Sequence, residues 1–175
     1  MGFHHVALAT RDIAATHHFY TEAMGFSLVK TVVAPVPGSP DGWSKHYFYD
    51  TGSDGMIAFW ELHDKQFADV KTNLNEAVGL PGWVNHFAYN APTRAFLDER
   101  RATWCSLGHM VAEVDHEFCV SIYTLDPDGN TVEFCHDLRD FTDTERSDAL
   151  RLMKDPSPAM DKDAKVTVHP PTNGG

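Results

Sequence analysis

The sequence predicts an α+β fold in which two βαβββ modules form a curved, barrel-like mixed sheet, followed by a C-terminal helix and tail. Three observations support this fold class. A short motif occurs twice, each copy is followed by the same order of helical and strand-like patterns, and the last segment has a different composition. The chain has 175 residues, of which 42% are hydrophobic, so it is long and apolar enough to bury a core.

The repeated motif consists of residues 4–8 and 85–89. In each run a His, His5 or His86, is followed by one apolar residue and then Ala. Each run leads into a helical pattern, and each helix is expected to end at a glycine, 20 residues after the first His (25 − 5) and 22 after the second (108 − 86). The first helix is expected to begin near Asp12, which can cap it, and the second is expected to begin at Thr93.

Three strand-like runs follow each helix, so each half reads strand, helix, strand, strand, strand. We therefore expect one domain over 1–140, with module one at 1–64, a linker at 65–81 and module two at 82–140. A loop rich in Pro and Gly at 34–44 lengthens the first module. The expected strands after the helices are 26–33, 45–50 and 56–62 in module one, and 110–114, 118–125 and 131–135 in module two.

The C-terminal segment, residues 141–175, is expected to form a helix and a flexible tail. Thr142 and Glu145 form a capping-box pattern for a helix that runs to about Lys154. Beyond it, Pro, Asp and Lys dominate and large apolar residues are few. We expect the last stretch to be loosely packed or to lie on a neighbouring molecule.

Composition excludes several classes of function. The net charge is −11, from 25 acidic and 14 basic residues, and no basic stripe is present, so a nucleic-acid partner is not expected. No apolar run is long enough to span a bilayer, and no signal peptide is recognised, so no membrane partner is expected. The three cysteines form no CxxC pair, which indicates a reducing compartment and predicts a cytoplasmic protein.

Four side chains are the candidate metal ligands. Because strand residues alternate between two faces, His5 and His86 each share a face with the Ala two positions later. Glu61 and Glu133 lie inside apolar strands, where an unpaired carboxylate is unfavourable. We expect these two imidazoles and two carboxylates to meet on one concave surface and to bind a dication.

The metal is expected to be one divalent ion. Mixed nitrogen and oxygen ligands favour Ni, Zn, Co, Mn or Fe(II) over Ca or Mg. Four protein ligands in an octahedral shell leave two positions for a small substrate that chelates through two oxygens. No organic cofactor site is recognised.

One segment carries a specific resemblance. Residues 121–134 contain Asp126-Pro127-Asp128-Gly129-Asn130 directly before the strand with Glu133. Together with the first motif and residues 19–26, this segment resembles the vicinal oxygen chelate superfamily, which includes glyoxalases, bleomycin resistance proteins and extradiol dioxygenases. The resemblance covers about residues 3–137. The same turn also has a structural role, since its Pro and Gly suit a tight hairpin.

The resemblance implies ligands at His5, His86 and Glu133, and a glyoxalase-like fourth ligand at Glu61. It therefore favours an isomerase or lyase that acts by metal-stabilised proton transfer on a substrate with vicinal oxygens. Glu61 or Glu133 would act as the base. A homodimer is also implied, and the site could lie within one chain or across two.

Two alternatives remain open. An Fe(II) extradiol ring-cleaving dioxygenase is indicated by Tyr123, ten residues before Glu133, and by His116 as an acid or base. The His that such enzymes carry before the fourth strand is replaced here by Asp54-Gly55. A metal-free binding or resistance protein is the other alternative. Softer candidates, equally explained by core packing, could line an aromatic pocket: Trp43, His46, Tyr47, Phe59 and Phe118.

Overall fold

The computed structural model describes residues 2–52 and 55–172, so Asp54 of the predicted Asp54-Gly55 position lies outside the described residues. The chain divides into two compact units. Unit 1 contains residues 1–89 and 124–132, and unit 2 contains residues 90–123 and 133–175. Among the described residues, no helix has the length and apolar character needed to cross a bilayer.

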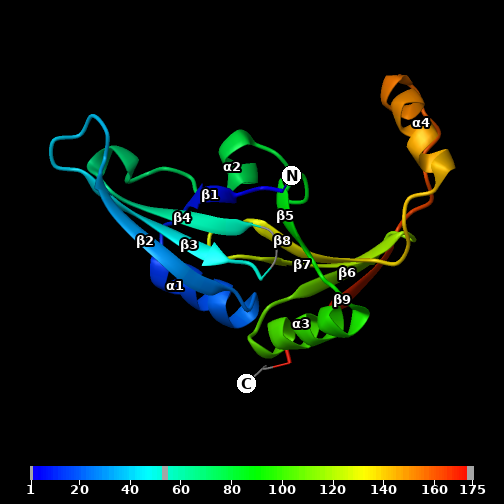
Figure 1. The fold of residues 1–175 in the computed structure, drawn as a ribbon, viewed down its shortest axis with the longest axis horizontal. Helices are drawn as coiled ribbons and strands as arrows, with labels where there is room; N and C mark the ends of the chain where they lie inside the picture. Colours follow the sequence, from blue (N-terminus) through cyan, green and yellow to red (C-terminus); the bar gives the residue numbers. More distant parts are fainter. Residues whose placement is uncertain (1, 53–54, 173–175) are drawn as a thin grey trace. The chain divides into compact units, whose positions relative to one another are not determined.

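Unit 1 contains the first βαβββ module in the predicted order (Figure 1). Its four-stranded sheet has the strand order β1-β4-β3-β2, in which β1 and β4 are parallel and the other pairs are antiparallel. The linker adds two short helices. The elements are β1 (His5–Ala9), α1 (Ile13–His18), the π-helical η1 (Phe19–Ala23), β2 (Ser27–Pro35), β3 (Trp43–Asp50), β4 (Met56–His63), η2 (Lys65–Phe67) and α2 (Leu74–Val78).

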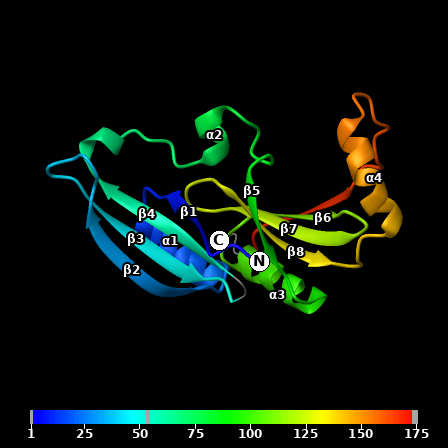
Figure 2. The ribbon, with the colours of Figure 1, turned by 45° about the horizontal axis from the view of Figure 1, so that its top comes forward.

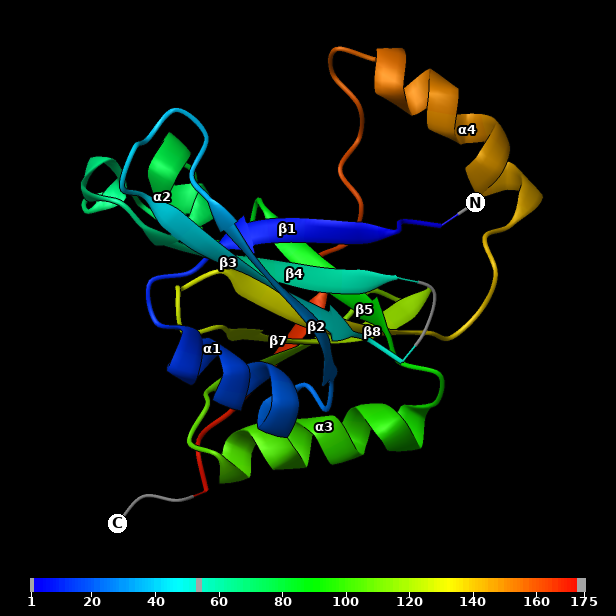
Figure 3. The same ribbon diagram turned by 60° about the vertical axis from the view of Figure 1, so that its left-hand side comes forward.

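The first helix begins as the sequence predicts and then widens. The Asp12 side chain accepts a hydrogen bond from the backbone N–H of Ala15, which caps α1. The helix continues as one wider π-type turn, and Gly25 follows with a positive φ of 77°. The helix lies along one face of the four-stranded sheet, as Figure 3 shows.

The core of unit 1 lies between this helix and the sheet. Tyr20, Tyr49 and Phe59 are all fully buried, and the Tyr20 and Phe59 ring centroids are 4.6 Å apart. Ile57 is also buried, at 1% exposure. Because Ile57 and Phe59 are two positions apart on β4, they define the face of β4 that is turned toward the helix.

Unit 2 contains most of the second module. The five-stranded sheet has the order β5-β8-β7-β6-β9, and β5, β7 and β8 each contain residues of both units. The described residues therefore form two sheets of four and five strands, which confirms the predicted α+β fold of two βαβββ modules. The elements are β5 (His86–Asn90), α3 (Arg94–Ser106), β6 (Val111–Asp115), β7 (Cys119–Leu125), β8 (Thr131–Asp137), α4 (Asp143–Lys154) and β9 (Lys165–His169).

Helix α3 covers one face of β8. Thr93 caps the helix by accepting a hydrogen bond from the backbone N–H of Phe96. Trp104 is fully buried, and its ring lies 5.6 Å from that of Phe134. Phe96 contacts the same Phe134 ring edge-on at 5.4 Å. Phe134 therefore marks the helix-facing side of β8, and the residues next to it in sequence point to the other side.

The C-terminal segment is more ordered than its composition indicates. Helix α4 has the expected capping box between Thr142 and Glu145. After it, residues 165–169 add strand β9 to the edge of β6, with Val114 opposite Val166. The expectation of a loosely packed end is wrong here, because an alternating Lys-Val-Thr-Val-His run is a good strand and β6 offers an open edge. Figure 2 shows α4 standing clear of the sheet between these two anchor points.

Candidate functional site

His5 lies near the start of β1, on the face of the sheet that is turned away from α1. It is paired with Met56 of the parallel strand β4. Its ring centroid lies 5.3 Å from that of Phe48 and 6.0 Å from that of His46, both on β3. Its Nδ1 is 2.8 Å from Nδ1 of His4. His5 is exposed, so the imidazole can reach a ligand without disturbing the core.

His46, on the same face, is a buried polar residue with an unsatisfied nitrogen. It is 8% exposed and its ring is stacked on Trp60 at 3.8 Å. Its Nε2 is buried and has no hydrogen-bond partner among the described residues. Burial, and secondly the nearby His5, lower the pKa of His46, so the ring is neutral at pH 7. An unsatisfied buried nitrogen is costly, which suggests that this atom has a partner when the protein functions.

From the sequence, His46 was predicted only as a residue that could line an aromatic pocket. Strand alternation could have indicated more, since His46 and Phe48 share one face of β3. What the sequence does not show is that this face lies against His5, because that depends on the order of strands in the sheet.

Glu61 lies elsewhere. It is five positions beyond Met56 on β4, and it occupies the helix-facing side defined by Ile57 and Phe59. Its carboxylate accepts a hydrogen bond from the Tyr47 hydroxyl at 2.7 Å and lies 3.2 Å from His63 Nε2 and 3.5 Å from Lys45 Nζ. Burial raises the pKa of Glu61, but Tyr47, Lys45 and His63 together lower it below the usual range. The structure therefore does not bring Glu61 together with His5.

The two modules can be aligned by equivalent backbone hydrogen bonds. In module one the N–H of Thr10, just after β1, donates to the carbonyl of Trp60 at 2.9 Å. In module two the N–H of Ala91, just after β5, donates to the carbonyl of Cys135 at 2.7 Å. Thr10 follows His5 by five residues, and Ala91 follows His86 by five residues. The two histidines are therefore equivalent in register.

The same alignment pairs the carboxylate of module two with an alanine in module one. Glu133 precedes Cys135 by two residues, and the residue that precedes Trp60 by two is Ala58. The neighbouring aromatic residues agree, because Phe59 packs on Tyr20 and Phe134 packs on Trp104. Glu61 is therefore not the module-one equivalent of Glu133. Ala58 and Glu61 are three positions apart, an odd number, so their side chains point to opposite faces.

Unit 2 brings together three of the predicted residues, Glu133, Tyr123 and His116. Glu133 is 5% exposed, and its carboxylate interacts with the hydroxyl of Tyr123. The Tyr123 hydroxyl is also 3.2 Å from Nε2 of His116. Burial, together with the nearby carboxylate of Glu133, raises the pKa of Tyr123 well above its usual range, so the phenol stays protonated. These contacts form a chain in which His116 donates to Tyr123 and Tyr123 donates to Glu133.

His86 begins β5 and is exposed. Its Nδ1 is 3.3 Å from the carbonyl oxygen of Val84, and because a carbonyl only accepts, Nδ1 is the donor in this contact. His5 and His86 belong to unit 1 and Glu133 to unit 2, so neither unit contains all three. Within residues 2–52 and 55–172, no group of three or more His, Cys, Asp or Glu side chains is close enough to hold a metal.

The donor set itself is chemically suited to a metal. Two imidazoles and one buried carboxylate are ligands that first-row transition metals accept. The Tyr123 hydroxyl supplies the outer hydrogen bond that usually orients a ligating carboxylate.

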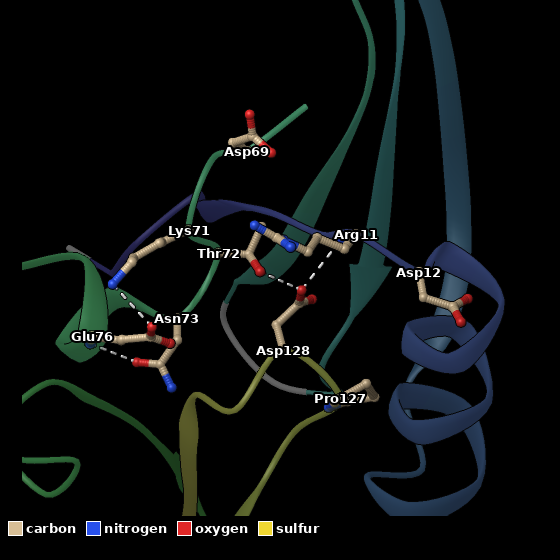
Figure 4. Close-up of a pocket in the computed structure, with 9 residues that line it drawn as sticks. All are labelled: Arg11, Asp12, Asp69, Lys71, Thr72, Asn73, Glu76, Pro127 and Asp128. Carbon is tan, nitrogen blue, oxygen red and sulfur yellow. Dashed lines mark hydrogen bonds and ion pairs between the residues drawn. The ribbon is translucent and has the colours of Figure 1, made fainter. Parts of the chain in front are cut away.

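The turn at 126–130 borders a separate cavity of about 370 Å³ in unit 1 (Figure 4). One Asp128 oxygen accepts hydrogen bonds from the backbone N–H of Arg11 at 3.1 Å and the hydroxyl of Thr72 at 2.6 Å. Lys71 and Glu76 form an ion pair across the cavity at 3.0 Å. These contacts tie the turn to the linker, which supports the structural role of the turn.

Comparison with known proteins identifies similar sequences and folds. The family described as "Glyoxalase/Bleomycin resistance protein/Dioxygenase superfamily" has a model that matches residues 2–134. No curated protein sequence matches the chain significantly.

Three solved structures illustrate the likeness in fold. A protein from Frankia with the same family description is 17% identical and has a TM-score of 0.57, covering 78% of this chain and 98% of its own. Fosfomycin resistance protein FosX from Listeria monocytogenes is 19% identical, with a TM-score of 0.55 and coverages of 83% and 98%. Lactoylglutathione lyase from Agrobacterium tumefaciens is 24% identical, with a TM-score of 0.50 and coverages of 77% and 92%. At these identities the likeness concerns the fold alone.

Proposed function

Since the chain belongs to the glyoxalase/bleomycin resistance protein/dioxygenase superfamily, we propose that it is an Fe(II)-dependent dioxygenase that cleaves the ring of catechols. The observation that carries this proposal is the register of the two modules. At the position that Glu133 occupies in module two, on the face shared with the repeated His, module one has Ala58.

The proposed ligands are His5, His86 and Glu133. Two histidines and one carboxylate form the set typical of non-haem Fe(II) oxygenases, which leave several metal positions open. A glyoxalase-like isomerase or lyase, which the sequence favoured, requires Glu61 as a fourth ligand. The contacts of Glu61 with Tyr47, Lys45 and His63 on the other face weigh against that role.

When bound, Fe(II) would bring the two catechol oxygens and O₂ together. The net reaction breaks one ring C–C bond beside the hydroxyl groups and adds both atoms of O₂ to the product, so no external reductant is needed. The Tyr123 hydroxyl would donate a hydrogen bond to the Glu133 carboxylate and so orient it. His116 would in turn donate a hydrogen bond to the Tyr123 oxygen.

His46 is the proposed general base. It is neutral, its Nε2 is buried without a hydrogen-bond partner among the described residues, and its ring lies 6.0 Å from that of His5. A catechol hydroxyl at this position would give Nε2 the hydrogen-bond partner that it lacks, and the imidazole would accept the hydroxyl proton.

The decisive experiment compares Glu133→Gln with the matched variant Glu61→Gln. Each protein is loaded anaerobically with Fe(II), its bound iron is measured, and ring opening of catechol is followed by absorbance and by O₂ uptake. We expect Glu133→Gln to lower kcat/KM by about 100-fold or more, because losing a ligand costs at least as much as losing an outer partner. Glu61→Gln should retain its iron and its activity.

The opposite results separate the alternatives. If Glu61→Gln loses its metal and the wild-type protein isomerises a vicinal-oxygen substrate, the glyoxalase-like hypothesis replaces this proposal. A wild-type protein that retains no metal after anaerobic loading would overturn the metal site and leave a binding protein.

A further inference from the structure

Strand β2 is an open edge of the four-stranded sheet in unit 1. It is the last strand in the order β1-β4-β3-β2, so it pairs with β3 on one side and with no other strand that the structure describes (Figure 1). Eight of its nine residues are exposed. The backbone N–H and C=O groups along its outer side are therefore available to a further strand.

The equivalent edge of module two is covered by the chain itself. Strand β6 has the place in the order β5-β8-β7-β6 that β2 has in the first sheet. Beyond it, β9 pairs with β6 over five positions. The two modules thus end in equivalent edge strands, and the C-terminal segment closes one of them. A partner for β2 has to come from another molecule.

The side chains of β2 favour pairing with another strand. Val29, Val32 and Val33 are 53%, 40% and 64% exposed, and β-branched residues are good strand formers. Natural edge strands are usually protected because they are short or carry charges. Strand β9 has five residues and has Lys165 and His169 at its ends. By contrast, β2 has nine residues and a single charge, which makes it the less protected of the two edges.

The charge distribution points to a second copy of this chain as the partner. With a net charge of −11, two copies repel each other over most of their surfaces. Residues 27–35 contain no carboxylate, so two copies can approach along this strand without acidic side chains facing each other. In an antiparallel pair centred on Val32, Lys30 lies opposite Ala34 of the second copy and Thr31 lies opposite Val33. The two Lys30 side chains are thereby kept apart.

We propose that two copies of this chain associate through antiparallel pairing of β2 with β2, centred on Val32, which joins two four-stranded sheets into one sheet of eight strands. The interface is isologous, because the same residues contribute from both sides. Its affinity comes from main-chain hydrogen bonds and from the exposed valines. The proposal is independent of the proposed function.

The pairing has a consequence for the face that carries His46. Two antiparallel neighbours are related by a two-fold axis perpendicular to the sheet, so equivalent faces of both copies point the same way. Val32 lies directly opposite His46 on β3. The histidine and aromatic faces of both copies therefore lie on the same side of the joined sheet, with β3 and β2 of each copy between its site and the axis.

The first test compares Val32→Lys with Val168→Lys. Both replace an exposed valine on an edge strand, but Val168 lies on β9. Analytical ultracentrifugation of the full chain over a wide concentration range gives the dissociation constant of the dimer. We expect the wild type to dimerise and Val32→Lys to raise this constant about tenfold or more, because a valine pair is replaced by two facing charges. Val168→Lys should leave it unchanged.

A second test does not depend on weakening the protein. Directly opposite residues in an antiparallel pair have Cα atoms about 4.5 or 5.5 Å apart, a separation that a disulfide spans. Val32→Cys should therefore form a covalent dimer on mild oxidation. Val29→Cys is the matched control on the same strand, because its counterpart lies six positions away along the pair. The wild type, whose Cys105 and Cys119 are buried, controls for the native thiols.

Three results would overturn the proposal. The first is a wild type that stays monomeric at every concentration. The second is a dimer that survives in Val32→Lys or dissociates in Val168→Lys. The third is equal cross-linking of Val29→Cys and Val32→Cys. None of these measurements uses a metal or a substrate, so failure of the interface and failure of the dioxygenase proposal are distinguishable.

Discussion

Strands β4 and β8 end the two modules and share the same scaffold, but they differ at one position. Both accept a backbone hydrogen bond from the residue that follows the module's first strand, and both pack a Phe beneath a helix. On the opposite face β4 has Ala58, which is fully buried, and β8 has Glu133, which is 5% exposed.

The difference shows how a duplicated fold can keep its packing in both halves and its chemistry in one. In each module the helix-facing residues are constrained by packing against the helix of that module. The other face is not constrained in this way, so module one has a histidine and aromatic face formed by His5, His46 and Phe48, whereas module two has a carboxylate bound to Tyr123.

The largest expected effect tests the shared scaffold. Phe59→Ala and Phe134→Ala should each lower the free energy of unfolding by about 3–5 kcal/mol, because both remove a fully buried ring and leave a cavity. Urea denaturation followed by tryptophan fluorescence measures the change. Val29→Ala, on an exposed position of β2, should stay within about 0.5 kcal/mol of wild type. A tolerated Phe134→Ala would show that the two cores are not equivalent.

The next effect tests the difference between the modules. In module one, Phe48 lies opposite Ala58, the equivalent of Glu133. Tyr123→Phe would place a Phe next to Glu133 in the same way and would remove the hydroxyl. We expect metal affinity to fall about 10–100-fold, because the hydroxyl that orients Glu133 is lost. Tyr47→Phe is the control, since it removes the equivalent bond to Glu61 on the other face. Equal losses in both variants would contradict the assignment of the two faces.

The smallest effect concerns strand β9, which module one lacks. Glu113 on β6 accepts hydrogen bonds from Arg94 at 2.8 Å, Arg101 at 2.5 Å and His169 of β9 at 2.9 Å. Burial raises its pKa, but the two guanidinium groups outweigh this and lower the pKa below its ordinary value of 4.5.

A lowered pKa means that this network stabilises the folded state above pH 4.5 and loses that contribution as the pH falls below it. Glu113→Gln should lower the free energy of unfolding by about 1 kcal/mol at pH 7 and by less at pH 3. Amide exchange of residues 165–169 should speed up in the same variant. Glu99→Gln, an exposed carboxylate on α3, is the control. A penalty that does not shrink at acid pH would contradict the role of the Glu113 charge.

Local sequence patterns predicted many of the elements of both modules. The cap at Asp12, the start of the second helix next to Thr93 and the left-handed glycine at Gly25 were predicted correctly because these features depend on a few adjacent residues. The strand β9 was missed because its pairing with β6 joins segments about 50 residues apart, and no local pattern records such a partner.

The sequence by itself determined the βαβββ repeat, the equivalence of His5 and His86, and the presence of a carboxylate at Glu133 inside an apolar strand. It did not determine which face of β4 is turned toward the helix, because both faces of that strand carry apolar residues. The packing of Phe59 on Tyr20 decided this, and it assigned Ala58 to the face of His5 and Glu61 to the other. Side chains alternate along a strand, so only the tertiary contacts could show which carboxylates are available to the same site.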